Sequence, residues 1–173
     1  GPRLAGSDAD QSARDWAVAK FKALGYDKVY TEEVKYPLWV RRRAPAALDA
    51  PFPQSLVLSA LGYSPGTPKG GLTAQVVKFD NLDALKAADP ASVKGKIVYI
   101  GYRMQRARDG HDYGMGSAVR TGGPVLAQTK GAAGFLLRSA GTYADQRIAH
   151  SGVTGFRDPA KAIPAAALSN PDA

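Results

Sequence analysis

Two apolar runs constrain the fold of this 173-residue chain more than any other feature. The first lies in "VKGKIVYIGYR", where residues 97–100 are Ile-Val-Tyr-Ile, and the second lies in "AGFLLRSA", residues 133–140. Such continuous runs are typical of strands buried on both faces, as in a parallel sheet. We predict strands over 96–101 and 134–138, joined by a helix over 124–131. A right-handed βαβ unit with a parallel pair at its core is therefore the expected centre of the fold.

Weaker strand signals surround this unit. They are "SLVLSALGY", "LTAQVVKFD", which precedes a short helix "LDALKAAD" capped by Asn81, and "AIPAAALSN" near the end of the chain. Glycine and proline predict loops between them: "SPGTPKGG", a basic glycine-rich loop over 102–123, and a long loop over 141–161. The sum is an α+β fold that is rich in strands, with flanking helices.

The first 40 residues carry a different pattern. Ser7 or Asp8 can cap a helix that Gly25 ends. Its apolar residues recur at helical spacing: Ala13, Trp16, Ala17, Phe21 and Leu24. "KVYTEEVKYPLWV", residues 28–40, alternates and predicts a strand, with Pro37 at an edge or a bend.

Residues 41–55 hold three prolines and show no clean periodicity. We therefore predict a boundary here, with one structural unit over 1–40 and another over 41–173. If the stripe of Trp16, Phe21 and Leu24 were fully buried within one compact domain, this boundary would be wrong.

Composition excludes several classes of function. The chain has no cysteine, so it forms no disulfide, thiolate zinc site or cysteine nucleophile. No apolar run approaches the roughly 20 residues that span a bilayer, so we expect no membrane span. The net charge of +8 is partly clustered, at Arg41–Arg43 and at Arg103, Arg106 and Arg108. Neither stacking aromatics nor a nucleic-acid-binding motif accompanies this charge, which disfavours nucleic acid as a partner.

The polar residues assemble no catalytic set. His111 and His150 are the only histidines, and "DGHDYG" places His111 between two aspartates in a glycine-rich loop, which we interpret as solvated. "GMGSAV" around Ser117 lacks the glycine spacing of a serine nucleophile elbow, and "GTPKGG" lacks the ending of a phosphate-binding loop. "RTGGP" could present backbone N–H groups to an anion at a helix start, although simple loop geometry is the commoner meaning. The residues alone favour a non-catalytic module.

Three stretches resemble one family. "GPRLAGSDADQSARDWAVAKFKALGYDKVYTEEVKYPLW" resembles the start of the mature region of M28-family zinc metallopeptidases, such as bacterial aminopeptidases and plasma glutamate carboxypeptidase-like proteins. "VKGKIVYIGYR", "AQTKGAAGFLLRSAG" and "IPAAALSNPDA" resemble a protease-associated (PA) domain, which is inserted near the start of many such enzymes. The resemblance implies that 1–40 is a helix-strand segment of the peptidase domain and that 41–173 is the PA insertion. An initial Gly1-Pro2 can also be left by removal of a tag, but the run into Arg3–Ser7 resembles genuine protein.

The family's zinc and catalytic motifs have no counterpart here. There is no His-x-Asp, since His111 precedes Asp112-Tyr113 and His150 precedes Ser151-Gly152, and the pair Glu32-Glu33 stands far too early. In the family these motifs follow the PA insertion. We therefore assign no catalytic or metal residue and no cofactor to this chain, and leave open whether the chain itself is an enzyme. The resemblance implies zinc in the parent enzyme, secretion or export to the periplasm, and the missing peptidase domain as a partner.

The resemblance also implies a role. PA domains of peptidases act as lids, select substrates or contact other proteins. Arg103, Arg106, Arg108, His111 and Tyr113 are the candidate contacts to a peptide substrate, because arginine suits bidentate recognition of a carboxylate. A merely solvated loop is the competing interpretation. Two alternatives stay open for the whole chain: a stand-alone protein- or peptide-binding module and, less favoured, an anion- or nucleic-acid-binding basic domain.

Overall fold

A computed structural model of the chain describes residues 3–156 and 158–173, so Gly1 and Pro2 of the opening motif lie outside the described residues. The chain forms two compact units, the first ending at Val40 and the second beginning at Arg41. The division falls where the proline-rich segment led us to place a boundary. The assignment of either unit to a named peptidase domain stays a prediction.

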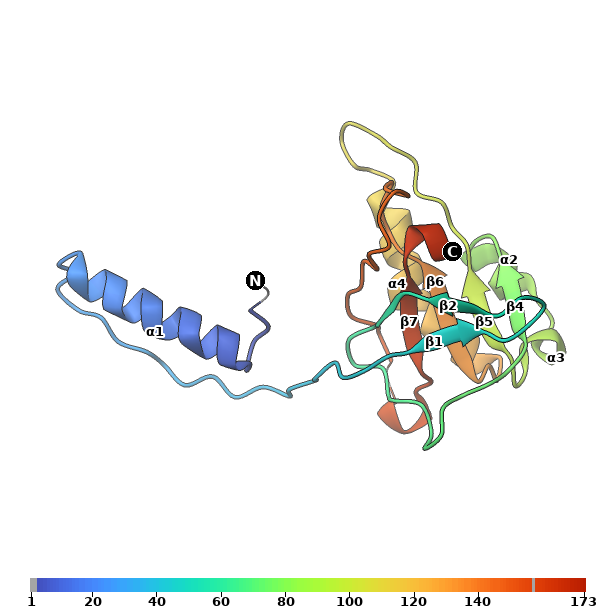
Figure 1. Cartoon of the computed structure of the whole chain (residues 1–173), viewed down its shortest axis with the longest axis horizontal. Helices are drawn as coiled ribbons and strands as arrows, with labels where there is room; N and C mark the ends of the chain where they lie inside the picture. Colours follow the sequence, from blue (N-terminus) through green and yellow to red (C-terminus); the bar gives the residue numbers. More distant parts are fainter. Residues whose placement is uncertain (1–2, 157) are drawn as a thin grey trace. The chain divides into compact units, whose positions relative to one another are not determined.

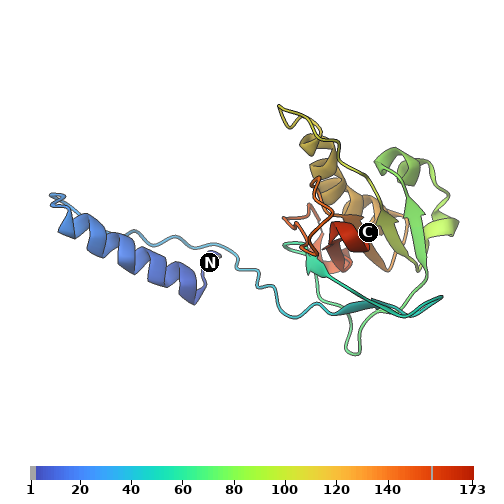
Figure 2. The same ribbon diagram turned by 45° about the horizontal axis from the view of Figure 1, so that its top comes forward.

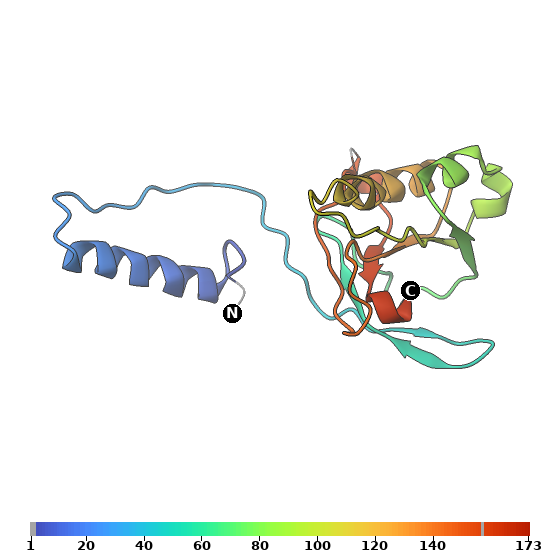
Figure 3. The same cartoon turned by 90° about the horizontal axis from the view of Figure 1, so that it is seen from above.

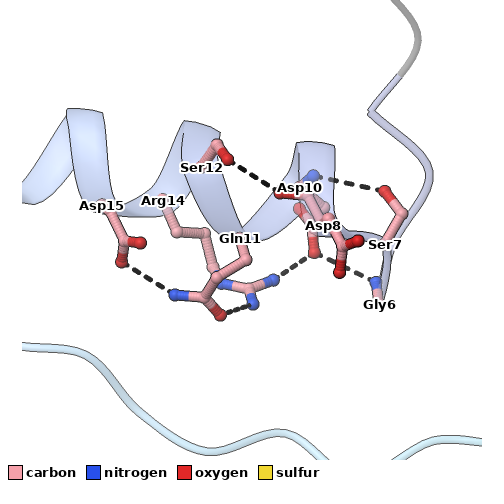
Figure 4. A network of polar contacts seen from close by, with 8 residues as sticks. All are labelled: Gly6, Ser7, Asp8, Asp10, Gln11, Ser12, Arg14 and Asp15. Carbon is pink, nitrogen blue, oxygen red and sulfur yellow. Dashed lines mark hydrogen bonds and ion pairs between the residues drawn. The ribbon is translucent and has the colours of Figure 1, made fainter.

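The first unit is built on α1 (Asp8–Ala23), which the sequence predicted. Ser7 Oγ accepts a hydrogen bond from the Asp10 N–H at 3.2 Å, while Asp10 Oδ2 accepts one from the Gly6 N–H at 3.0 Å (Figure 4). At the other end Gly25 has φ +79°, and the Tyr26 N–H reaches back to the Phe21 carbonyl at 3.4 Å. Local contacts at both ends of the helix therefore satisfy part of its free backbone groups.

Several polar side chains of α1 bond to one another. Arg14 bonds to Asp10 and Gln11, and Gln11 donates to Asp15 Oδ1 at 2.7 Å (Figure 4). No described residue of the helix is buried, and Trp16, Phe21 and Leu24 are 68%, 46% and 60% exposed. The apolar stripe that the sequence predicted is present but uncovered.

Residues 28–40 do not form the predicted strand. This segment returns along α1 as an irregular chain, and Leu38 Cδ1 lies 3.0 Å from where a Cβ on Gly6 would be (Figure 1). Within the described part of the chain it pairs with no other strand. Alternation alone is insufficient, because a strand is stabilised by the partner whose backbone completes its hydrogen bonds.

The second unit contains a five-stranded sheet in the order β3-β7-β6-β5-β4. Its strands are β3 (Leu58–Ala60), β4 (Val76–Phe79), β5 (Ile97–Ile100), β6 (Gly134–Arg138) and β7 (Ala165–Leu168). From β4 to β7 neighbouring strands are parallel, while β3 is antiparallel to β7. The predicted parallel pair and the α+β class are confirmed.

Helices cover one face of this sheet. α2 (Leu82–Ala87) and α3 (Pro90–Val93) connect β4 to β5, and α4 (Tyr113–Thr129) connects β5 to β6. Each step moves to the neighbouring strand in the same direction, so right-handed crossovers put all the helices on the same side (Figure 3). Asn81 caps α2 as predicted, since its Oδ1 accepts from the Ala84 N–H at 2.8 Å.

The core lies between the sheet and these helices. Its members come from alternate strand positions and from the inner sides of the helices; they include Leu85, Val93, Val98, Ile100, Val119, Ala127, Phe135, Leu137, Ala165 and Ala167. Phe135 is the largest fully buried side chain. The two apolar runs, residues 97–100 and 134–138, supply its centre.

A hairpin of β1 (Ala46–Leu48) and β2 (Gln54–Leu56) lies on the side of the sheet away from the helices (Figures 2 and 3). The connection between its strands carries Phe52, which is 81% exposed. Two short 3₁₀ turns, Pro159–Lys161 (η1) and Asn170–Asp172 (η2), flank β7 in the sequence. In the described part of the chain, no helix is both long and apolar enough to cross a membrane.

The predicted boundaries fail around α4. We expected a loop over 102–123 and a helix from Pro124, but the helix begins at Tyr113 and holds Pro124 in its interior. Gly122 and Gly123 are therefore helical. Both interpretations of "RTGGP", the favoured loop geometry and the less favoured anion cradle at a helix start, are wrong because no helix starts there. A Cβ on Gly123 would lie 2.4 Å from Phe135 Cζ, so this glycine allows α4 to approach β6 closely.

Candidate functional site

The predicted site residues gather at one edge of the sheet. Because β4 to β7 are parallel, their carboxyl ends lie at the same edge, and the segments that leave β5, β6 and β7 begin there. Residues 101–112 follow β5, residues 139–156 follow β6, and η2 follows β7. We call these three segments the carboxyl-edge segments. Loops at this edge are the usual place for ligands in α/β sheets.

Asp112 fastens the first of them. Its Oδ1 accepts the Tyr102 hydroxyl at 2.5 Å and its Oδ2 accepts the Gln105 N–H at 2.5 Å, and the residue is buried. The Tyr102 hydroxyl, with help from the Gln105 N–H, holds the pKa of Asp112 below its ordinary value. The same contact raises the pKa of Tyr102. Asp112 is thus an ionised acceptor that shapes the loop.

Arg103, Arg106 and Arg108 project from this loop and are exposed. None of the three forms an ion pair within the described part of the chain. Their charges are therefore available to solvent or to a partner. The structure does not test whether these three side chains contact a substrate, so that role stays a prediction.

Arg103 also faces a second basic group. Arg138, at the end of β6, donates to the Asn170 carbonyl at 2.9 Å, and burial together with the charge of Arg103 lowers its pKa. Burial raises the pKa of Tyr99 on β5, and the charges of Arg138 and Arg103 oppose that shift. The open face of the sheet is therefore electropositive near the carboxyl ends of β5 and β6.

His111 pairs with Asp109 and with no larger set of ligands. Its Nδ1 lies 2.8 Å from Asp109 Oδ1, and hydrogen bonding to His111 lowers the pKa of Asp109. Both side chains are exposed. Over residues 3–156 and 158–173, no group of three or more His, Cys, Asp or Glu side chains is placed to hold a metal ion.

Tyr113 belongs to a cluster that sequence analysis missed. Its hydroxyl lies 3.2 Å from His150 Nε2, and Arg120 donates to the same hydroxyl at 3.3 Å. Arg120 also donates to Ser117 Oγ at 3.0 Å, and its guanidinium lies 6.0 Å from the centre of the Tyr113 ring. We call Tyr113, Ser117, Arg120 and His150 the α4 cluster.

The segment that carries His150 is well anchored, although the sequence predicted only a loop. The His150 N–H donates to Ser139 Oγ at 2.8 Å, and Arg41 donates to Ser151 Oγ at 2.9 Å. Gly62 forms a parallel bridge with Val153, donating to the Gly152 carbonyl at 2.7 Å and accepting from the Thr154 N–H at 3.0 Å. Residues 150–154 thus lie between β3 and α4 in a fixed position.

One error explains why the cluster was missed. Tyr113, Ser117 and Arg120 are spaced by four and three residues, which puts them on one face of a helix. With the helix placed from Pro124 onward, the same residues fell in a loop and their spacing had no meaning. His150 could not be found at all, because it reaches the cluster only through tertiary contacts.

Relatives of known family cover the whole chain. It is 30% identical over 178 residues to carboxypeptidase Q of Homo sapiens and 31% identical over 173 residues to carboxypeptidase Q of Xenopus laevis. Among solved structures, a peptidase M28 precursor from Shewanella amazonensis is 49% identical, with a TM-score of 0.91 over 99% of this chain. This chain is a homologue of M28 peptidases. No protein-family model matches it.

The match to M28 proteins is partial on their side. The chain spans 35% of the length of the two carboxypeptidases Q and 39% of the Shewanella protein. The zinc aminopeptidase BSAP from Bacillus subtilis has the same fold over 99% of this chain, with a TM-score of 0.61 and 21% identity. The family resemblance predicted from the sequence is confirmed.

Proposed function

We propose that this chain is the amino-terminal, non-catalytic portion of a longer M28-type zinc aminopeptidase or carboxypeptidase. Residues 41–173 would form its PA domain, flanking the active-site cleft as a lid, a substrate-selecting surface or a protein-interaction surface. The observation that carries the proposal is the coverage: the M28 relatives align over the whole chain, and the chain accounts for 35–39% of their length.

The first unit supports this proposal through its uncovered apolar side chains. Burial of one large apolar side chain contributes roughly 1.5–3 kcal/mol, and Trp16, Phe21 and Leu24 obtain little of it. Several apolar side chains of residues 28–40, among them Tyr30 and Val34, are exposed as well. A peptidase domain that packs on this unit would remove that surface from water.

Zinc belongs to the rest of such an enzyme. The described residues do not fit a zinc site, because the His111–Asp109 pair offers two ligands where a catalytic zinc takes three from the protein. Any metal-dependent step would take place outside these residues. For the parent enzyme we propose a secreted or periplasmic location, on the strength of the family resemblance.

The carboxyl-edge segments are the surface through which the PA domain would select substrates. Arg103, Arg106 and Arg108 are exposed, and the buried Asp112 carboxylate holds their loop in shape. A guanidinium pairs well with a carboxylate. Peptides with an acidic side chain or a free carboxyl terminus would therefore be the favoured substrates.

Steady-state kinetics of the protein extended by the rest of its reading frame test this role. In the double variant Arg106→Ala/Arg108→Ala, KM for an acidic peptide should rise about threefold to tenfold, in keeping with partly exposed charge pairs. KM for a neutral peptide should change less. Arg42→Ala/Arg43→Ala removes the same charge at another exposed site and serves as the control. An unchanged KM for both peptides would remove the substrate role from the loop.

The non-catalytic assignment needs a separate measurement. The 173-residue chain should show no peptidase activity with added zinc, whereas the extended protein should show activity that a chelator abolishes. Zinc-dependent hydrolysis by the short chain alone would contradict the proposal. Salt-sensitive retention on DNA would favour the basic-domain alternative instead.

A further inference from the structure

The α4 cluster joins two segments that are distant in the sequence. Tyr113 and Arg120 stand seven residues apart on one face of α4, and His150 comes from the segment after β6. The Tyr113 hydroxyl lies 3.2 Å from His150 Nε2 and 3.3 Å from the Arg120 Nη1 that donates to it. The rings of Tyr113 and His150 meet edge to face at 6.0 Å.

The positive charge in this cluster has no anion. Arg120 is always protonated, and its two hydrogen-bond partners, Tyr113 and Ser117, are neutral hydroxyls. Within the described residues no carboxylate pairs with it, and its Nε is buried without a hydrogen-bond partner. The nearest carboxylates in the sequence are engaged elsewhere: Asp109 by His111, and Asp112 by Tyr102 and Gln105. A partly buried guanidinium gains stability from an anion.

The cluster is also rigidly framed. A Cβ on Gly152 would lie 2.7 Å from Arg120 Cζ, so this glycine lets the chain pass directly against the guanidinium. The bridge to Gly62 and the bond to Ser139 fix the same segment from the other side. Tyr113 is 40% exposed and His150 is exposed, so a ligand from solvent can approach the cluster at these two residues. A preorganised site loses little entropy when it binds.

We propose that Tyr113, Arg120 and His150 form a binding site for a single carboxylate group. The planar guanidinium fork matches the two oxygens of a carboxylate, and the Tyr113 hydroxyl and the His150 ring supply further donors beside it. One fixed positive charge balances a monoanion rather than a phosphate dianion. This inference does not rest on the proposed peptidase function, because the site lies wholly within residues 113–150 of this chain.

Titration of the isotope-labelled 173-residue chain tests the site. N-acetylglycine is the probe, since it presents one carboxylate beside an amide, and N-acetylglycinamide is its neutral counterpart. At constant ionic strength the Arg120 Nε–H and His150 ring NMR signals should shift saturably with the acid and not with the amide. Equal shifts with both compounds, or no saturation at these two residues, would overturn the proposal. Tighter binding of inorganic phosphate would overturn the carboxylate assignment.

Variants locate the binding. Arg120→Gln should weaken the affinity about tenfold or more, because a hydrogen bond to a charged group is among the stronger ones. Tyr113→Phe keeps the packing and removes one hydroxyl, so it should weaken binding a few-fold; it decides the matter if the Arg120 variant does not fold. Arg42→Gln removes the same charge at an exposed site and should leave the affinity unchanged. Equal weakening by Arg42→Gln, or none by Tyr113→Phe and a folded Arg120→Gln, would show that only overall charge acts.

Discussion

The two long helices of this chain differ in almost every respect except length. α1 has 16 residues, without glycine or proline, and α4 has 17 residues that include four glycines and Pro124. Yet α1 has no buried residue among those described, whereas α4 buries Gly116, Val119, Gly123, Pro124 and Ala127. Intrinsic propensity and burial run in opposite directions.

The comparison separates two ways of making a helix. α1 depends on local terms: Ser7 at its start, Gly25 after its end and side-chain pairs along its surface. Helices that depend on local terms are marginal in water below about 12–15 residues, and α1 is only slightly longer, with 16. α4 depends on the sheet beneath it, which compensates for residues that would otherwise disfavour a helix. Changes to the core should therefore affect α4, and changes to local interactions should affect α1.

The largest expected effect is at the aromatic ring beneath α4. Phe135→Ala should lower the free energy of unfolding of the second unit by about 3–5 kcal/mol, because it leaves a cavity against Gly123. Denaturant unfolding followed by near-UV circular dichroism measures this. Phe52→Ala removes an aromatic ring that is 81% exposed and should stay within about 0.5 kcal/mol of the wild type. Equal effects of the two variants would refute the assigned core.

Two neighbouring glycines of α4 test the contact between this helix and β6 more directly. Gly123→Ala places a methyl group into the Phe135 ring and should destabilise the second unit by about 1–3 kcal/mol. Gly122→Ala meets no atom within 4 Å and should stabilise it by about 0.5–1 kcal/mol, since alanine favours the helix. Thermal unfolding of both variants shows the contrast. If they shift the midpoint in the same direction, α4 does not lie against β6 as described.

Acid unfolding distinguishes a buried carboxylate in the second unit, Asp172, from a half-buried one in the first, Asp10. Burial alone would raise the pKa of Asp172, but donors from Val57, Ser169 and Arg147 outweigh it and hold the pKa below its ordinary value. A lowered folded-state pKa contributes stability above the unfolded value of about 3.9, and that stability is lost as the pH falls through the folded-state pKa.

Asp172→Asn should therefore cost the second unit about 1–3 kcal/mol at pH 7 and progressively less below about pH 4. Urea titrations at a series of pH values measure this difference. Asp10→Asn, which alters the Arg14 network of α1, should leave the same unfolding transition in place. A loss at Asp172 that is constant with pH would show that its ionisation plays no part.

The smallest expected effect is on the exposed stripe of α1. Trp16→Ser should change the stability of the 173-residue chain by less than about 0.5 kcal/mol, because the indole is 68% exposed. In a longer protein that covers the stripe, the same change should cost at least about 1.5–3 kcal/mol. Parallel thermal unfolding of the two lengths tests this. An equally large loss in the short chain would mean that Trp16 is already buried.

Much of the second unit could be predicted because its central strands are continuous apolar runs, which is the pattern of strands buried on both faces. Residues 97–100 and 134–138 are apolar on both faces, and both emerge as strands of a parallel pair. The failures occurred where tertiary contacts override local preference. The glycines of α4 are typical of a loop until the Phe135 ring is known to lie against one of them.

The first unit and the candidate site show what the sequence pattern could not predict. Residues 28–40 alternate like a strand, but a ladder requires a partner that the sequence pattern does not supply. Arg103, Arg106 and Arg108 were found because clustered charge is visible in the sequence. The meeting of Tyr113 with His150 was not, because it joins residues 37 positions apart through tertiary contacts.

Both ends of the second unit are held at β3, which is only three residues long, or at Val57, the residue before it. The Arg41 side chain donates to the Ala60 carbonyl at 3.0 Å, while the Val57 N–H donates to Asp172 at 2.8 Å and the Val57 carbonyl accepts from Ser169. Tension applied between these two ends would therefore load β3 first and bypass the rest of the sheet. Because β3 is an edge strand that pairs only with β7 in the described sheet, it is the element that connects the two ends. Pulling experiments should therefore find the weakest point of the second unit at the β3–β7 ladder.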